Sequence, residues 1–229
     1  MSEPVRLALV GATGMVGRQV MARAVGRHDV RLTAVARREV PLPAGARMEM
    51  LLSDPSHWDD AIPAAQPQVV VIALGTTIRA AGGDKAAFRA VDHDLVLKCA
   101  RAAKEAGARQ LIAVSSVGAS AASRNFYLSV KGETEDALAR LKFDRLDIVR
   151  PGLLRGQREG PLRFGERLGM WLNPLVDPFL RGGWMKYRSI RASTLADAIL
   201  ALAGARARGR FVHEHEALKR AIREHARRG

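Results

Sequence analysis

The chain has 229 residues, of which 48% are hydrophobic and 26% are charged. This is enough to bury a full core in one domain, or in one domain with a small additional lobe. The formal net charge is +14, most of the basic residues are arginine, and residues 155–229 alone carry a net charge of +9. A single cysteine, Cys99, excludes an intramolecular disulfide framework and a thiolate zinc site.

The first residues, MSEPVRLALVGATG, do not place a charged region before a long apolar run, which is the pattern of a secretory signal. No stretch approaches about 18 uninterrupted apolar residues, the length that a membrane-spanning helix needs. We therefore expect a cytoplasmic protein without a membrane span.

Strands and helices are predicted to alternate along the first two thirds of the chain. The predicted strands are short apolar or β-branched runs: Val5–Val10, Val30–Ala36, Arg47–Leu52, Gln68–Leu74, Gln110–Val114 and Leu146–Val149. The predicted helices have apolar residues at three- and four-residue steps: Met15–Val25, Asp84–Gly107 and Phe126–Leu141. This alternation is typical of an α/β fold with a doubly wound parallel sheet of the Rossmann type, in which the strand order is 3-2-1-4-5-6.

The pattern changes after Pro151. Residues 155–188 are poor in periodicity and contain two of the three Trp residues. Three further elements are predicted: a helix over Ser193–Ala203 with a serine N-cap, a short strand at Phe211–Val212 and a terminal helix over His213–Arg228. We expect residues 1–154 to form the core and residues 155–229 to form a small lid or substrate lobe, not an independent domain.

The sequence GATGMVG, Gly11–Gly17, lies between the first predicted strand and the first predicted helix. Gly11 permits a tight turn, Gly14 lets the backbone approach a pyrophosphate, and Gly17 lets the helix pack closely on the strand. The free N–H groups at the helix N-terminus then face the phosphates. Because strand, turn and helix occur together, the glycines predict dinucleotide binding by residues 1–154.

The end of the second predicted strand distinguishes NAD from NADP. An acidic residue there would bind the ribose 2′-hydroxyl, whereas this chain has Arg37 and Arg38. Two guanidinium groups suit a 2′-phosphate and favour NADPH, although a solvated arginine pair at a strand end is the alternative. The loop of Leu74, Gly75 and Thr76 is expected to line the other side of the cofactor.

Tyr127 and Lys131 form a Y-x-x-x-K pattern at the start of a predicted helix, so both lie on one helix face. A free tyrosine has a pKa of about 10, and a neighbouring ammonium favours the tyrosinate that acid–base catalysis needs. Ser115 and Ser116 close the preceding strand, where ligands bind in such sheets. The pattern indicates a Ser-Tyr-Lys catalytic site, with an ordinary amphipathic tyrosine–lysine pair as the alternative.

Four segments, ALGTTIRAAG, VSSVGAS, FYLSVKGE and IVRPGLL, resemble one subgroup of the short-chain dehydrogenases/reductases. It is the atypical branch similar to the Tat-interacting-protein oxidoreductase, and the likeness covers about residues 5–155. The resemblance implies NADPH at the glycine turn and catalysis by Ser116, Tyr127 and Lys131. The cofactor-binding positions that we predict are Gly11, Ala12, Thr13, Gly14, Met15, Val16, Gly17, Arg37, Arg38, Leu74, Gly75, Thr76, Ser115, Tyr127, Lys131, Pro151, Gly152 and Leu153.

Several histidine, acidic and aromatic residues lie outside the predicted cofactor and catalytic positions. His213, His215 and His225 suggest a metal only weakly, since no known ligand spacing is present, and we interpret them as surface residues and expect no metal site. Asp92 and Asp94 are interpreted as solvated or capping, and Cys99 as an inert core thiol. Four residues either line a substrate pocket or pack a lid core or dimer contact: Trp171, Phe179, Trp184 and Met185.

The sequence thus predicts an NADPH-dependent oxidoreductase that transfers a hydride to a small carbonyl-type substrate. An epimerase or dehydratase is a variant within this class. A regulatory or redox-sensing NADPH-binding protein with little turnover is the alternative, because some members of the resembling family are described so. Nucleic acid is disfavoured as a partner because no aromatic residues interleave with the arginines of the terminal segment, and a homodimer is left open.

Overall fold

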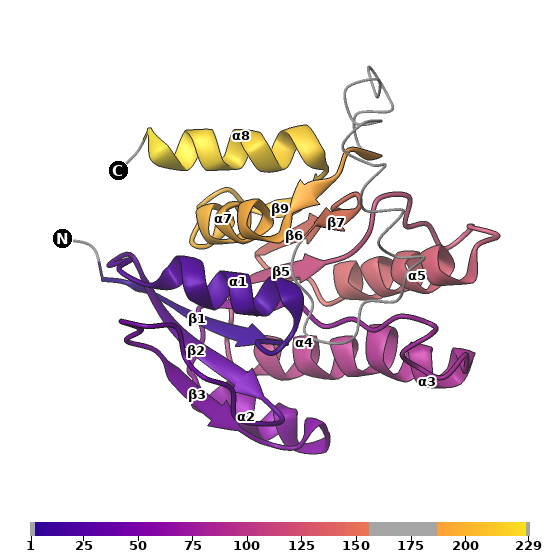
Figure 1. The fold of residues 1–229 in the computed structure, drawn as a ribbon, viewed down its shortest axis with the longest axis horizontal. Coiled ribbons are helices and arrows are strands. Elements are labelled where there is room, and N and C mark those ends of the chain that lie inside the picture. Colours follow the sequence, from indigo (N-terminus) through magenta and orange to yellow (C-terminus); the bar gives the residue numbers. More distant parts are fainter. Residues whose placement is uncertain (1–2, 156–186, 228–229) are drawn as a thin grey trace.

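The computed structural model describes residues 3–155 and 187–227. Its centre is a seven-stranded parallel sheet with the order β3-β2-β1-β4-β5-β6-β9 (Figure 1). The strands are β1 Val5–Val10, β2 Val30–Ala36, β3 Glu49–Leu52, β4 Val69–Ile72, β5 Gln110–Val114, β6 Arg145–Val149 and β9 Gly209–His213. The predicted doubly wound α/β fold is confirmed, and the strand order reverses at β1, between β2 and β4.

The central strands are buried because helices cover both faces of the sheet. Every residue of β4 and β6 is buried, as expected for strands without a solvated face. On one face lie α1 Met15–Ala24 and α7 Ala192–Leu202; on the other lie α2 Trp58–Ala64, α4 Val96–Glu105 and α5 Phe126–Arg140. In the described ranges no helix is both long and apolar enough to cross a membrane.

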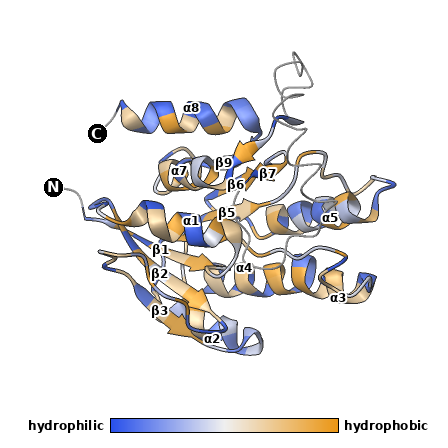
Figure 2. Cartoon of the chain, viewed as in Figure 1, coloured by the Kyte–Doolittle hydropathy of each residue, from blue (hydrophilic) through white to orange (hydrophobic). Residues whose placement is uncertain are grey.

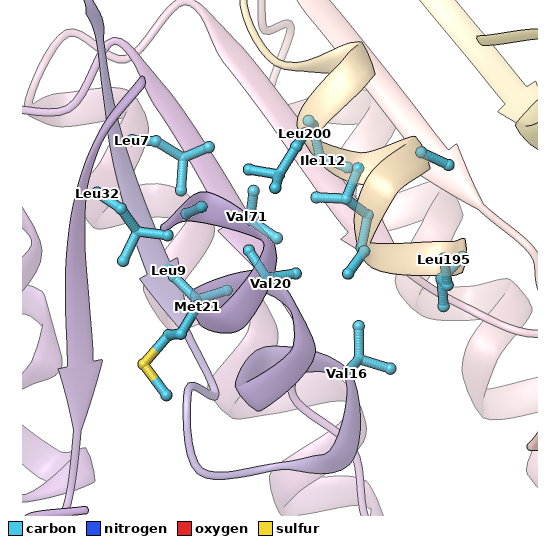
Figure 3. Close-up of a cluster of buried hydrophobic side chains, with 14 of the residues drawn as sticks. Leu7, Leu9, Val16, Val20, Met21, Leu32, Val71, Ile112, Leu195 and Leu200 are labelled. Carbon is cyan, nitrogen blue, oxygen red and sulfur yellow. The ribbon is translucent and has the colours of Figure 1, made fainter. Parts of the chain in front are cut away.

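Two apolar clusters, one on each face, hold the layers together. In the cluster of Figure 3, Val20 and Met21 of α1 meet Leu7 and Leu9 of β1, and α7 adds Leu195. Each fully buried aliphatic side chain of this kind contributes about 1.5–3 kcal/mol relative to its exposed state. Helix α8, His215–Ala226, covers α7 from outside, and its outward face is hydrophilic (Figures 1 and 2).

The helix predicted over Asp84–Gly107 is interrupted. It consists of α3 Lys85–Arg89, a π-helical segment Ala90–Leu95, and α4 Val96–Glu105. Asp84 caps its start by accepting a hydrogen bond from Ala86 N, and Gly107 follows its end with a φ of +83°. Turns of the π type widen the helix by one residue and occur often at functional sites, so the segment Ala90–Leu95 is called the π segment below.

Three local predictions differ from the structure. Helix α2, which follows the short 3₁₀ turn Pro55–His57, is not among the helices predicted from the sequence. Helix α7 begins at Ala192 with Arg191 at the N-cap and without a side-chain cap, so the predicted serine cap is wrong. Helix α8 begins at His215 because the preceding residues are taken up by β9.

The edge strand β9 is fixed to β6 through the buried carboxylate of Asp147. This carboxylate accepts two hydrogen bonds from Arg145, at 2.7 Å each, and lies 2.7 Å from Nε2 of His213 on β9. Gln110 of β5 donates to it at 2.7 Å and also to the last carbonyl of α7, at Leu202. Burial favours a higher pKa for Asp147, but the hydrogen bonds from these groups outweigh it and hold the pKa below its usual range.

Candidate functional site

The glycine turn is built by close backbone packing at the end of β1. Gly11 has a φ of +90°, and a Cβ there would lie 2.7 Å from the carbonyl oxygen of Ala73, just after β4. A Cβ on Gly17 would lie 2.2 Å from the carbonyl oxygen of Gly11, so α1 rests directly on the turn. Gly14 is the N-cap of α1 and offers no capping side chain. The turn therefore leaves α1's first N–H groups open to an anion, and its shape fits a pyrophosphate.

Gly17→Ala is expected to destabilise the chain by about 3 kcal/mol and to abolish dinucleotide binding, because a methyl group would overlap immovable backbone. Chemical denaturation and a fluorescence titration with NADPH measure the two effects. Gly26→Ala is the matched control: its Cβ would meet nothing, so only its positive φ of +75° costs about 1 kcal/mol. Equal losses in the two variants would contradict the close packing.

Arg37 and Arg38 lie directly after β2, on the strand next to the glycine turn. The register pairs Val10 of β1 with Val35 of β2, so both strands end at the same edge of the sheet. Both arginine side chains are exposed. This edge therefore presents guanidinium groups beside the turn, on the β2 side of the point where strand order reverses.

Helix α5 carries Tyr127 and Lys131 one turn apart near its start. Its N-cap, Asn125, accepts a hydrogen bond from Leu128 N and fixes where the helix begins. The half-buried Tyr127 ring packs against Phe88 of α3 with 5.7 Å between centroids. Lys131 is buried, and its Nζ lies 2.7 Å from Oδ1 of Asp92 in the π segment.

Asp92 is a functional candidate that the sequence analysis missed. The prediction that it is solvated or capping is wrong: its side chain is 0% exposed. Its Oδ2 accepts a hydrogen bond of 2.7 Å from the backbone of Thr76 in the predicted cofactor loop. A signal was present in the sequence, since Asp92 stands four residues after Phe88 and four before Val96, both of which are buried.

The two serines after β5 have different surroundings. Ser115 is buried and donates a hydrogen bond of 2.5 Å to Glu135 of α5, whose carboxylate is also bound by Arg150. Glu135 in turn raises the pKa of Arg150 by accepting its hydrogen bonds. Ser116 is half-buried, and within residues 3–155 and 187–227 its hydroxyl makes only a long contact, 3.4 Å, with the carbonyl of Val117. Of the two serines, Ser116 is therefore the one whose hydroxyl no described residue holds closely.

The remaining predicted cofactor residues lie at the same edge. Leu74 and Gly75 follow β4, and Pro151, Gly152 and Leu153 follow β6. Pro151 accepts a hydrogen bond from Val117 N at 3.0 Å, which ties this loop to the one after β5. All the predicted positions thus follow the carboxyl ends of β1, β2, β4, β5 and β6, where open α/β sheets bind ligands.

The aromatic set proposed for a substrate pocket, Trp171, Phe179 and Trp184, lies outside the described residues, as does Met185. Cys99 is buried as predicted, and burial raises the pKa of its thiol to about 12. The histidines are not a surface pair: the His213 side chain is 12% exposed and bound to Asp147, and His215 is 5% exposed. Within residues 3–155 and 187–227, no three metal-ligating side chains gather.

The family described as NAD(P)H-binding matches residues 11–173. Among curated proteins, the mitochondrial protein FMP52 of Eremothecium gossypii is 39% identical over 170 residues, covering 73% of this chain and 75% of that protein. The mitochondrial protein fmp52 of Aspergillus clavatus is 35% identical over 201 residues, covering 84% and 86%. The prediction of a cytoplasmic protein is contradicted by these relatives, which are named mitochondrial. Its basis was weak because a missing secretory signal does not separate cytoplasm from mitochondrion.

Solved structures share the fold. A putative NAD-dependent epimerase/dehydratase from Bacillus halodurans has a TM-score of 0.67 at 20% identity, covering 96% of this chain and 99% of that one. MoeE5 in complex with UDP-glucose and NAD has a TM-score of 0.68 at 15% identity, covering 96% and 81%. With the family match over most of the Rossmann sheet, the chain belongs to the family described as NAD(P)H-binding.

Proposed function

We propose that the chain is an NADPH-dependent oxidoreductase that reduces a small carbonyl-type substrate. The observation that carries the proposal is the placement of Tyr127 and Lys131 on α5, at the sheet edge that holds the glycine turn and Ser116. Residues 1–154 act as the cofactor-binding core, and the remainder contributes the substrate lobe. Family membership supports the cofactor class, while the arrangement of side chains supports the chemistry.

The proposed roles follow from the polar groups that each residue can offer. Bound NADPH supplies the hydride that the substrate carbon accepts. The Tyr127 hydroxyl donates a proton to the substrate oxygen, and Ser116 holds that oxygen by a hydrogen bond. The Lys131 ammonium forms an ion pair with Asp92, and its N–H groups donate hydrogen bonds to the hydroxyls of the nicotinamide ribose.

The preference for NADPH over NADH is assigned to Arg37 and Arg38, which are exposed beside the turn. Arg37→Ala is expected to weaken NADPH about 10- to 100-fold, the value of a charge-assisted hydrogen bond to phosphate, and to leave NADH within about twofold. Fluorescence titration with each dinucleotide measures the difference. Arg31→Ala is the matched control, because Arg31 is an exposed β2 arginine that pairs with Glu49. A similar loss for both cofactors would rule out the 2′-phosphate role.

A further inference from the structure

Asp92 joins two parts of the candidate site that are far apart in the sequence. Its Oδ1 lies 2.7 Å from Lys131 Nζ on α5, and its Oδ2 accepts a 2.7 Å hydrogen bond from Thr76 N in the loop after β4. Gly75 lies directly over this pair: a Cβ there would lie 3.5 Å from Asp92 Oδ1 and 3.8 Å from Lys131 Nζ. One carboxylate therefore touches both the cofactor loop and the lysine of the Y-x-x-x-K pattern.

The backbone of the π segment holds Asp92 in place. The Thr134 hydroxyl of α5 lies 3.1 Å from the carbonyl oxygen of Asp92, and 2.7 Å from that of Val130. The single hydroxyl proton is shared between these two carbonyls, so the main chain of Asp92 adds a weaker contact with α5 to the ion pair of its side chain. A carboxylate restrained in this way presents its two oxygens in fixed directions, which is what orienting a neighbouring ammonium requires.

Lys131 has no equivalent alternative partner among its described neighbours. The other buried carboxylate nearby, Glu135, already accepts hydrogen bonds from Ser115 and Arg150. The void between these groups has a volume of about 10 Å³, at the lower limit for a single water. Among the described residues, Asp92 is therefore the counter-charge of the Lys131 ammonium.

The sheet order separates the two halves of a bound dinucleotide. Arg37 follows β2, on one side of β1, whereas the Thr76 loop and α5 follow β4 and β5 on the other. A dinucleotide bound across β1 with its 2′-phosphate at Arg37 places its nicotinamide half over β4 and β5. Asp92 contacts the Thr76 loop and α5, the two elements on that side of β1.

We propose that Asp92 is a positioning residue, which holds Lys131 and the Thr76 loop in the arrangement that binds the nicotinamide half of NADPH. This inference rests on the proposed function for the identity of the cofactor. Asp92 acts through Lys131 and the loop, not on the substrate. Its removal therefore weakens binding of the nicotinamide half and leaves the adenine half unaffected.

The test compares NADPH with 2′,5′-ADP, a probe that keeps the adenine half and the 2′-phosphate but lacks nicotinamide. In Asp92→Asn, the amide oxygen still accepts from Thr76 N, but its NH₂ group then faces the ammonium and the ion pair is lost. We expect the affinity for NADPH to fall about tenfold, because Lys131 loses the charge that orients it, while the affinity for 2′,5′-ADP stays the same. Calorimetric titration measures both.

Two variants control the experiment. Asp94→Asn removes a carboxylate from the same π segment, where its side chain is 63% exposed and pairs with His93; both ligands should bind as in wild type. When Lys131 is already replaced by Met, adding Asp92→Asn should weaken NADPH binding by less than about twofold. The effects of the two substitutions do not add, because the residues are coupled. That double variant keeps the test valid if Asp92→Asn alone folds poorly, since it removes both charges of the buried pair together.

The outcomes separate the two proposals. Unchanged NADPH affinity in Asp92→Asn, or an equal loss for NADPH and 2′,5′-ADP, would overturn the role of Asp92 while wild-type binding leaves the cofactor assignment intact. An additive effect in the Lys131→Met background would overturn action through Lys131. If the wild-type chain bound neither ligand, the proposed function itself would fall, and the role of Asp92 with it.

Discussion

Tyr127→Phe is expected to reduce kcat for carbonyl reduction about a hundredfold to ten-thousandfold, the contribution of a positioned proton donor. The substitution removes one hydroxyl and keeps the ring that packs against Phe88 at 5.7 Å, so the fold and the NADPH affinity should be unchanged. The measurement is NADPH oxidation with a panel of aldehydes and ketones, together with a titration of NADPH in the absence of substrate.

The chain offers a matched control because it has two tyrosines. Tyr187→Phe makes the same chemical change at a side chain that is 41% exposed and to which no proton transfer is assigned, so kcat should be retained. Full activity of Tyr127→Phe would refute the catalytic role. A wild-type chain that binds NADPH tightly but oxidises it with no carbonyl would instead favour the regulatory alternative.

Asp147→Asn is expected to lower the free energy of unfolding by about 3–5 kcal/mol, the cost of breaking a buried ion pair from one side. The Asp147 side chain is 0% exposed and that of Arg145 is 9% exposed, so Arg145 loses its counter-charge in a place that water hardly reaches. His213 of β9 loses the same partner. Urea denaturation at neutral pH measures the change, and loosening of the β9 edge should appear as faster amide exchange there.

The contribution of Asp147 to the free energy of unfolding changes with pH in a defined direction. Because the pKa of Asp147 is lowered in the folded chain, its stabilising contribution is complete above the unfolded value of about 3.9 and is lost as the pH falls through the folded value. The Asn variant should lose that part of the acid dependence. Asp144→Asn is the control, because Asp144 is 43% exposed and pairs loosely with Arg208 at 3.7 Å; its cost should be under about 1 kcal/mol. If Asp147→Asn also lowered the free energy of unfolding by less than about 1 kcal/mol, the buried hydrogen-bond network around Asp147 would not be a major source of stability.

The sheet was predictable because its strands are apolar on both faces. Val5–Val10, Val30–Ala36 and Gln110–Val114 have the same bounds in the sequence analysis and in the structure. Helix interiors were predictable from their apolar spacing, but the π segment Ala90–Leu95 was not. The π segment is stabilised by contacts of Asp92 with Thr76 and with Thr134, which lie on other elements. Contacts between elements do not change the local spacing of apolar residues, so the sequence pattern does not predict them.

Some parts of the candidate site were predictable from local sequence patterns, and others depend on contacts between elements. The glycine turn and the Tyr127–Lys131 pair are local patterns, and the sequence analysis found both. Asp92 and Glu135 were missed because each is a charged residue whose partners lie on a different element or loop. The spacing of Asp92 from Phe88 and Val96 indicates the buried face of the helix. Burial of a carboxylate also depends on the partner that compensates its charge, and that partner is seen only in the assembled fold.

The position of β9 has a consequence for how the chain tolerates change. Strands β6 and β9 are neighbours in the sheet, although residues 150–208 separate them in the sequence. The two strands pair along their whole length, from Arg145 opposite Gly209 to Val149 opposite His213. Among the described strands, β9 pairs with β6 alone, whereas β1, β2, β4 and β5 each have a neighbour on both sides. A substitution that weakens the contacts between β6 and β9 should therefore open this edge locally and leave the other strand pairs intact.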